Sequence, residues 1–374
     1  MVNLHGIIYA YHSYSALNQL VTCRTSASLP FCSRYRLIDF ALSSMTNAGV
    51  RDVGVIMHKN YQSLLDHVEG GKEWDLSRGT GGLSLLPPYG FYDSDRGEYR
   101  GFMEALGATR SYSRQIKQDH VVLFRGDQAT NIDLKRVYDQ HISTNADITA
   151  VCTEKRGSTT DDSIYFTLDK GEVFSTHMHF RSSSGKNDYY STEVYIIRKS
   201  LLMDLISWSQ ENGKLHFHRD ALAHYLNGGG RIGIYIHKNY TMRICSVGDF
   251  YDSNLDMLNP DIRADLFPDD RPVYTKGRSS VSTYYADTSK VKNCLVADGC
   301  FIEGEVENSI LFRGVRIGKG AKIKDSIIFQ DTVIGDNVEL TCVICDKNVI
   351  CSPNVVLTGN RRLPVTVPKG QQLL

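Results

Sequence analysis

The sequence lacks an excess of charge of either sign, because 42 lysines and arginines are balanced by 42 aspartates and glutamates. A neutral chain does not attract nucleic acid through its overall charge, so we expect no nucleic-acid partner. It also lacks any apolar run close to the roughly 18 residues that a membrane span requires. No signal-like segment precedes the first apolar run. We therefore predict a cytoplasmic protein without a membrane partner.

A disulfide framework is absent as well. The nine cysteines are odd in number and are scattered from Cys23 to Cys351, which is not the pattern of a secreted disulfide protein. Cys342 and Cys345 have the spacing of a zinc pair, but no second pair accompanies them. We interpret these two thiols as core packing and expect reduced cysteines throughout.

Up to about residue 250, short apolar runs alternate with helical patterns. This alternation predicts an α/β fold with a mostly parallel sheet covered by helices, of the Rossmann-like kind. A glycine-rich phosphate loop should follow the first strand, yet residues 11–16 contain no glycine. The runs predicted as strands are 5–10, 52–57, 120–127, 147–154, 193–199 and 231–237.

From about residue 287 the sequence follows a six-residue repeat, which predicts a left-handed parallel β-helix. Many proteins with such repeats are acyltransferases that use a histidine in the coils as general base. No histidine follows His237 here, so we interpret the repeat as an assembly module. The chain then divides into an α/β domain at 1–250, a linker at 251–286 and the β-helix at 287–374. Six-residue spacing links Leu311, Ile317, Ile323 and Phe329, and likewise Val315, Ala321, Ile327 and Val333. After a slip in phase, it resumes at Val338, Ile344, Ile350 and Val356.

Several longer motifs carry a family resemblance in chain order. They include LPFCSRYRLIDFALSSMTNAGV at 29–50, WDLSRGTGGLSLLPPY at 74–89, VVLFRGDQATNIDL at 121–134 and CSVGDFYDSNLDML at 245–258. Together with the β-helix, they resemble the glucose-1-phosphate adenylyltransferases. That resemblance implies that residues 1–250 form a nucleotidyltransferase-like domain. In the family, this domain makes ADP-glucose from ATP and glucose 1-phosphate in bacterial glycogen synthesis.

The same resemblance identifies substitutions at the positions that handle phosphate and metal. Ser13 lies where the family has its glycine-rich loop, and Ser26 replaces a family lysine. Asp127 keeps the first of two metal carboxylates, while Ser246 replaces the second, with Asp249 as a weaker substitute. A single carboxylate holds Mg²⁺ poorly. We therefore expect no required cofactor, and Mg²⁺ only weakly at Asp127.

The remaining family positions concern sugar and effector. The family's glutamate and lysine that hold the sugar phosphate have no counterpart between Val173 and Ser191, whereas Ser191 and Asp220 match positions near the sugar. In the family, phosphorylated metabolites bind at basic residues between the domains. The candidates for that effector role here are Arg24, Arg34 and Arg36.

A chain that keeps its fold and assembly module but loses its phosphate chemistry resembles the regulatory, D-type subunit of these enzymes. The resemblance implies a heterotetramer with a catalytic subunit, little or no activity of the chain alone, and possible homo-oligomers without the partner. Two alternatives stay open. One is an active sugar-phosphate nucleotidyltransferase with an atypical phosphate loop, and the other is a stand-alone sugar-phosphate sensor.

Overall fold

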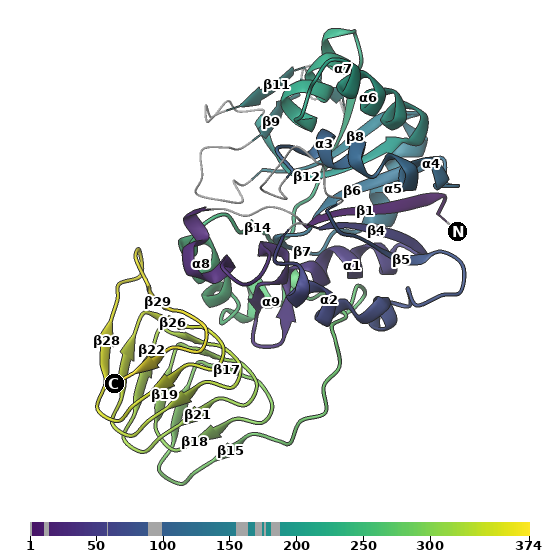
Figure 1. Ribbon diagram of the computed structural model, residues 1–374. Coiled ribbons are helices and arrows are strands. Elements are labelled where there is room, and N and C mark those ends of the chain that lie inside the picture. The colour runs from purple at the N-terminus through teal and green to yellow at the C-terminus, as the bar shows by residue number, and fades with distance from the viewer. Residues whose placement is uncertain are drawn as a thin grey trace.

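The computed structural model describes residues 2–10, 15–57, 59–88, 99–154, 164–168, 174–175, 177–180 and 188–374. Ser13 and most of the loop after the first strand lie outside these residues. Figure 1 shows an α/β domain joined by a long connection to a stack of β-coils. The predicted fold class is confirmed.

The main sheet has the strand order β10-β13-β8-β12-β6-β1-β4-β5, with β9 and β11 attached beyond β12. Neighbours from β6 to β5 run parallel, and β12 is antiparallel to both β6 and β8. The strands are β1 (Leu4–Ala10), β4 (Asp52–Met57), β5 (Gly82–Leu86), β6 (His120–Arg125), β8 (Ile148–Thr153), β9 (Ile164–Thr167), β10 (Phe174–Ser175), β11 (His177–Phe180), β12 (Asp188–Arg198) and β13 (Ile232–Ile236). All six strands predicted from the sequence are present.

Helices cover both faces of this sheet, as its fully apolar strands require. One face packs against α1 (Leu37–Asn47), α2 (Gln62–Val68) and α5 (Leu134–Ser143), and the other against α3 (Phe102–Ala108) and α6 (Lys199–Glu211). The two short pairs are β2 (Pro30–Phe31) with β3 (Tyr35–Arg36), and β7 (Gln128–Thr130) with β14 (Thr241–Arg243). The other helices are η1 (Ser15–Val21), η2 (Ser26–Ser28), η3 (Glu69–Trp74), α4 (Arg110–Gln115), η4 (Phe217–Leu222), α7 (Ala223–Asn227), α8 (Val247–Asp256) and α9 (Pro260–Leu266).

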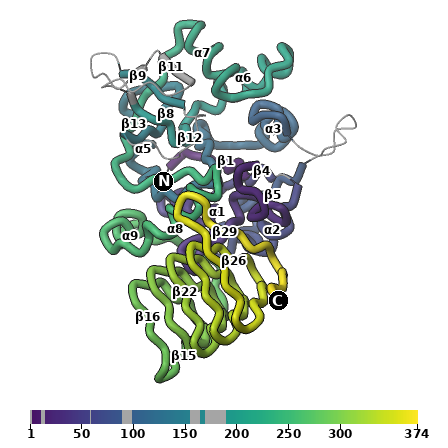
Figure 2. Tube along the Cα trace, turned by 90° about the vertical axis from the view of Figure 1, so that its left-hand side faces the viewer, coloured from purple at the N-terminus to yellow at the C-terminus, as the bar shows by residue number. Residues whose placement is uncertain are grey.

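The C-terminal part forms three parallel sheets that are the three faces of a prism, with the coils stacked in Figure 2. The first face contains β15 (Tyr284–Tyr285), β18 (Phe301–Ile302), β21 (Arg316–Ile317), β24 (Val333–Ile334), β27 (Ile350–Cys351) and β30 (Gln372–Leu373). The second contains β16 (Lys290–Lys292), β19 (Glu305–Glu307), β22 (Lys322–Lys324), β25 (Glu339–Thr341) and β28 (Val356–Thr358). The third contains β17 (Leu295–Val296), β20 (Ile310–Leu311), β23 (Ile327–Ile328), β26 (Val343–Cys345) and β29 (Val365–Val367).

The inward register differs in part from the strict six-residue ladder. Leu311, Ile317 and Ile323 fill the interior of the coils, but Val333 is 38% exposed and Phe329 packs against the α/β domain. The interior continues instead at Ile328, five residues after Ile323, because the third face is one residue shorter. A coil of seventeen residues is one short of three six-residue repeats, so the inward positions shift by one residue in each coil.

The three faces of the prism have different surroundings. The third face packs against the α/β domain through Ile310, Ile327 and Ile344, which join one core with Phe250 and Tyr251 of α8. The second face carries exposed ion pairs such as Lys322–Glu339 at 2.9 Å. The first face exposes the large apolar side chains Tyr284, Phe301, Val333 and Ile350, with the exposed Arg316 between Phe301 and Val333. Among the described residues, no helix is long and apolar enough to cross a membrane.

Candidate functional site

A buried ion cluster lies where β6 ends. Arg125 is the last residue of β6, and Asp127 follows it in a bend that brings the two side chains together. The Arg125 guanidinium donates from Nε to Asp127 Oδ1 at 2.5 Å and from Nη2 to Oδ2 at 3.2 Å. The two residues are 2% and 1% exposed, so the pair is shielded from water.

Glu193 joins this cluster from β12 and balances its charge. Its Oε1 accepts hydrogen bonds from Arg125 Nη1 and from Arg243 Nη1, each at 2.6 Å. Burial opposes the charged form of Arg125, but Asp127 and Glu193 outweigh it and raise the pKa of the guanidinium well above its ordinary value. Glu193 lies at a β-bulge with a φ of 55°, a conformation that side chains rarely adopt and that the surroundings must stabilise.

The residues at the family's metal positions do not fit Mg²⁺. Both oxygens of Asp127 are occupied by Arg125, and Ser26 Oγ also donates to Oδ2 at 3.2 Å. Ser246 caps α8 by accepting the Asp249 backbone N–H at 3.0 Å, and Asp249 accepts the Cys245 N–H at 3.2 Å. In the described part of the chain, no three histidine, cysteine or carboxylate side chains are placed to hold a metal.

The two residues predicted near a sugar are bonded within their own segments. Ser191 Oγ lies 2.7 Å from the Tyr195 hydroxyl. Asp220 Oδ2 accepts the backbone N–H groups of Leu215 at 3.2 Å and His216 at 2.9 Å, which caps the helix that begins at Phe217. A sugar-binding role for Ser191 and Asp220 therefore stays a prediction.

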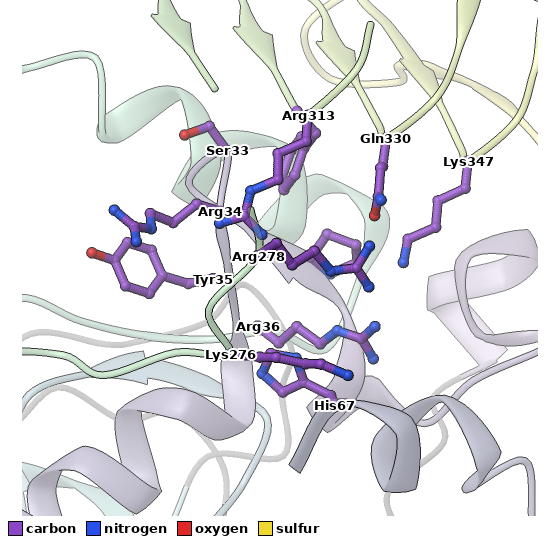
Figure 3. A pocket seen from close by; sticks show the side chains of 12 residues that line it. Ser33, Arg34, Tyr35, Arg36, His67, Lys276, Arg278, Arg313, Gln330 and Lys347 are labelled. Atoms are coloured by element: carbon purple, nitrogen blue, oxygen red, sulfur yellow. The ribbon is translucent and has the colours of Figure 1, made fainter. Parts of the chain in front are cut away.

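A second site lies between the α/β domain and the β-helix. This interdomain pocket is shown in Figure 3, where side chains from the β-helix meet others from the N-terminal segment and from the connection. Six of its lining residues are cationic and none is acidic. The lining residues are Pro30, Ser33, Arg34, Tyr35, Arg36, His67, Lys276, Arg278, Phe312, Arg313, Gln330 and Lys347.

The β-helix contributes a corner column to this pocket. Arg313, Gln330 and Lys347 are each seventeen residues apart and occupy the same corner in successive coils, and they reach in the same direction in Figure 3. Asp298 lies one coil earlier and pairs with Arg313 Nε at 3.3 Å. Lys347 lies two coils beyond Arg313, so it is the member of the column farthest from that carboxylate. Gln330, which lies between them, is neutral.

The α/β domain contributes Arg36 through a well-fixed hairpin. The Arg36 backbone N–H donates to Asp39 at 2.9 Å at the start of α1, and its guanidinium donates to Ser63 Oγ at 2.8 Å. Asp39 also holds His67 at 2.5 Å. Cys32 and Ser33 in the hairpin turn have φ values of 48° and 62°, the left-handed region that glycine adopts without strain.

The three predicted effector residues have different surroundings. Arg36 lines the pocket and is buried, whereas Arg34 is exposed at its edge with its guanidinium 5.8 Å from the Tyr35 ring centre. Arg24 does not line the pocket. It is 3% exposed and donates to Asp346 of the β-helix at 2.9 Å, so it ties the two domains together.

The crowding of cations changes their ionisation. Burial, together with Arg36, Arg24 and Arg278, lowers the pKa of Lys347 to about 7, although Asp346 opposes the shift. Burial and the neighbouring Arg24 and Arg278 likewise lower the pKa of Arg36 to about 10. Burial is the larger cause of both shifts, and the neighbouring arginines add to it because like charges at short range disfavour the charged form.

Sequence reasoning missed four cations of the pocket, namely Lys276, Arg278, Arg313 and Lys347. The seventeen-residue spacing of the corner column was the available signal for two of them. Nothing in the sequence placed the connection that carries Lys276 and Arg278 beside the N-terminal hairpin. Lys276 is partly engaged outside the pocket, where its Nζ contacts the backbone carbonyl of Asp66 at 2.6 Å.

Comparison with known proteins agrees with this architecture. Residues 19–162 match the nucleotidyl transferase family, and residues 280–362 match the GlmU-like C-terminal hexapeptide family. The fold and the two sites thus define a nucleotidyltransferase-type domain joined to a hexapeptide β-helix.

Individual relatives specify the family. The chain is 33% identical to the glycogen biosynthesis protein GlgD of Bacillus subtilis (strain 168), over 98% of this chain and 95% of the relative. It is 34% identical to GlgD of Geobacillus stearothermophilus, over 85% and 82%. It is 29% identical to a glucose-1-phosphate adenylyltransferase of Fusobacterium nucleatum, over 86% and 84%. The chain belongs to the glucose-1-phosphate adenylyltransferase family and resembles its GlgD members.

Proposed function

We propose that this chain is a regulatory subunit of glucose-1-phosphate adenylyltransferase that supports ADP-glucose synthesis for glycogen biosynthesis. It associates with a catalytic subunit in a heterotetramer and has little or no activity alone. Relatives named for glycogen biosynthesis and for the adenylyltransferase reaction support this pathway. It acts in the cytoplasm and requires no cofactor of its own.

The observation that carries the proposal is the engagement of Asp127 by Arg125. Adenylyl transfer needs cations free to stabilise charge that develops on phosphate, and carboxylates free to hold Mg²⁺. Here the carboxylates of Asp127 and Glu193 instead neutralise Arg125 and Arg243. The charged groups of this cluster stabilise one another, so they do not serve adenylyl transfer.

The interdomain pocket supports the regulatory part of the proposal. Guanidinium and ammonium groups without carboxylate partners form strong, charge-assisted hydrogen bonds to phosphoryl oxygens. Arg36, Arg278 and Lys347 are the residues that would bind a phosphorylated metabolite there. An effector so placed contacts both domains and the connection, and its binding would therefore depend on how the domains are arranged.

The exposed face of the β-helix supports association with a subunit of the same architecture. Phe301, Val333 and Ile350 are each more than a third exposed on one sheet, whereas the third face is packed and the second carries a ladder of ion pairs beside Val291 and Val356. We propose that this face contacts the catalytic subunit. Phe301→Glu and Ile350→Glu together should abolish co-purification of the two subunits while leaving the folded chain unchanged by circular dichroism.

The test of function measures ADP-glucose formation by this chain alone, by the catalytic subunit alone, and by the two co-purified. We expect no turnover by this chain and a changed rate, substrate affinity or effector response in the mixture. Asp127→Asn removes the partner of the buried Arg125 and should destabilise this chain, but it should leave the turnover per folded complex in the mixture unchanged. Robust Mg²⁺-dependent turnover by the chain alone, lost in Asp127→Asn, would overturn the proposal in favour of an active enzyme. Ligand binding without any effect on the catalytic subunit would favour a stand-alone sensor.

A further inference from the structure

We propose that Lys347 takes up a proton when an oxyanion enters the interdomain pocket, so that occupancy of the pocket responds to pH as well as to ligand concentration. This proposal rests on the pocket being the effector site proposed above. It adds a proton as a second ligand that binds together with the anion.

The first step of the argument is the fixed position of Lys347. Its backbone N–H donates to Asp346 Oδ1 at 2.6 Å, and its carbonyl accepts the Gly370 N–H at 2.9 Å. Both backbone groups are thus held at a corner of the β-helix. The side chain extends from this corner towards Arg278 and Arg36, as Figure 3 shows.

The second step is the balance of charge around the Lys347 ammonium group. Arg36 comes from the N-terminal hairpin, Arg278 from the connection, and Arg24 from the segment behind Asp346. The nearest carboxylate, Asp346, already accepts the Arg24 guanidinium at 2.9 Å. Within the described ranges, no hydrogen bond or ion pair joins the side chain of Lys347 or of Arg278 to a carboxylate.

The third step concerns the other groups that face the pocket. Arg313 is paired with Asp298, Lys276 is paired with Glu69, and His67 is bonded to Asp39. Arg34 and the Tyr35 hydroxyl lie towards the edge that is remote from Lys347 in Figure 3. Lys347 is therefore the cation that combines crowding by arginines with an ammonium group able to lose its proton.

Protonation and anion binding then favour each other. In the empty pocket the pKa of Lys347 is about 7. An oxyanion beside the ammonium group stabilises its charged form and raises that pKa, so above pH 7 binding is accompanied by proton uptake. Affinity should be nearly constant below about pH 7 and should fall by up to about tenfold for each pH unit above it.

Inorganic sulfate is the suitable probe, because it remains a dianion across this range, whereas phosphate monoesters titrate near about pH 6. Calorimetry on the full chain near pH 8, in two buffers with different heats of ionisation, measures the protons absorbed per sulfate bound. We expect uptake approaching one proton, and an affinity that falls between about pH 7 and pH 9.

Two variants assign the proton. Lys347→Arg keeps a permanent charge, and it should bind sulfate without proton uptake and without the decline in affinity above pH 7. His67→Gln should retain both effects. A Lys347→Arg chain that still absorbs a proton, or a wild-type chain that binds sulfate without uptake, would overturn the proposal but leave the effector site intact. No sulfate binding at any pH would remove the effector site itself, while the co-purified subunit assay would still decide the regulatory role.

Discussion

Arginine is used in opposite ways in the buried ion cluster at the end of β6 and in the interdomain pocket. In the cluster, Arg125 and Arg243 contact the carboxylates of Asp127 and Glu193, and the charges are balanced. In the pocket, Arg278 and Lys347 have no carboxylate partner in the part of the chain that the structure describes. A balanced buried cluster contributes to a unique fold, whereas an unbalanced one creates affinity for an anion.

The largest expected effect on the free energy of unfolding comes from removing one negative charge from the buried ion cluster. Glu193→Gln leaves Arg125 and Arg243 sharing the single charge of Asp127, and a buried charge without a partner destabilises a protein by about 3–5 kcal/mol. Glutamine has nearly the same shape as glutamate, so the loss of stability would not come from a change in the backbone conformation at this position. Urea unfolding measures the change.

The matched control for that variant is Glu69→Gln, which removes the carboxylate that pairs with Lys276. The Glu69 side chain is 63% exposed, so the expected loss is below about 0.5 kcal/mol. Equal losses in the two variants would contradict a special role for the buried cluster.

The next effect concerns the buried ion pair between Arg24 and Asp346, which lies beside the pocket. Asp346→Asn leaves Arg24 buried without a carboxylate, and we expect a loss of about 2–3 kcal/mol in the free energy of unfolding. The same change should tighten sulfate binding, because it removes the carboxylate nearest to Lys347. Asp147→Asn, which removes the half-exposed carboxylate that pairs with Arg198 outside the pocket, serves as the control. A stability loss without tighter sulfate binding would show that the charge of Asp346 does not influence anion binding in the pocket.

A smaller effect should appear in the pH dependence of stability. The pKa of Lys347 lies near 7 in the folded chain and near that of ordinary lysine in the unfolded chain, so the folded state binds fewer protons between these values. Stability should therefore rise with pH from about 7 to about 10, by about 1–2 kcal/mol after solvent screening. Thermal unfolding of Lys347→Met, compared with wild type, isolates this contribution, which the variant should lack.

The smallest effect on stability should have the opposite sign to that of Glu193→Gln. Arg278→Met removes a cation from a crowded pocket, so it should stabilise the chain near neutral pH by about 0.5 kcal/mol and weaken sulfate binding. Arg316→Met, on the exposed face of the β-helix, should change neither quantity. Destabilisation by Arg278→Met would indicate that the pocket is balanced after all.

The sequence predicted the fold well because periodicity is a local property. The six strands of the α/β domain and the three-faced β-helix follow from alternating apolar runs and from repeated short strands. The exact inward positions were harder to predict, since the five-residue third face moved Val333 to the surface and turned Phe329 towards the other domain.

The sites were predicted only in part, because they depend on contacts between distant segments. Arg125 and Asp127 are two residues apart, so a local pair between them could have been proposed from the sequence, whereas the contacts of Glu193 and Arg243 could not. Arg36 was identified through the family resemblance. Its neighbours Arg278 and Lys347 are brought to it by the path of the connection and by the seating of the β-helix.

The ion pair between Arg24 and Asp346 also has a consequence for the order in which the molecule forms. These partners are separated by 322 residues, so the N-terminal segment leaves the ribosome long before the corner of the β-helix that receives it. The α/β domain can fold first during synthesis, but Arg24 must wait for almost the entire chain to be made. A prematurely terminated chain would therefore present an uncovered cation and an unfinished surface, and it should be recognised by chaperones and proteases before it could enter an oligomer.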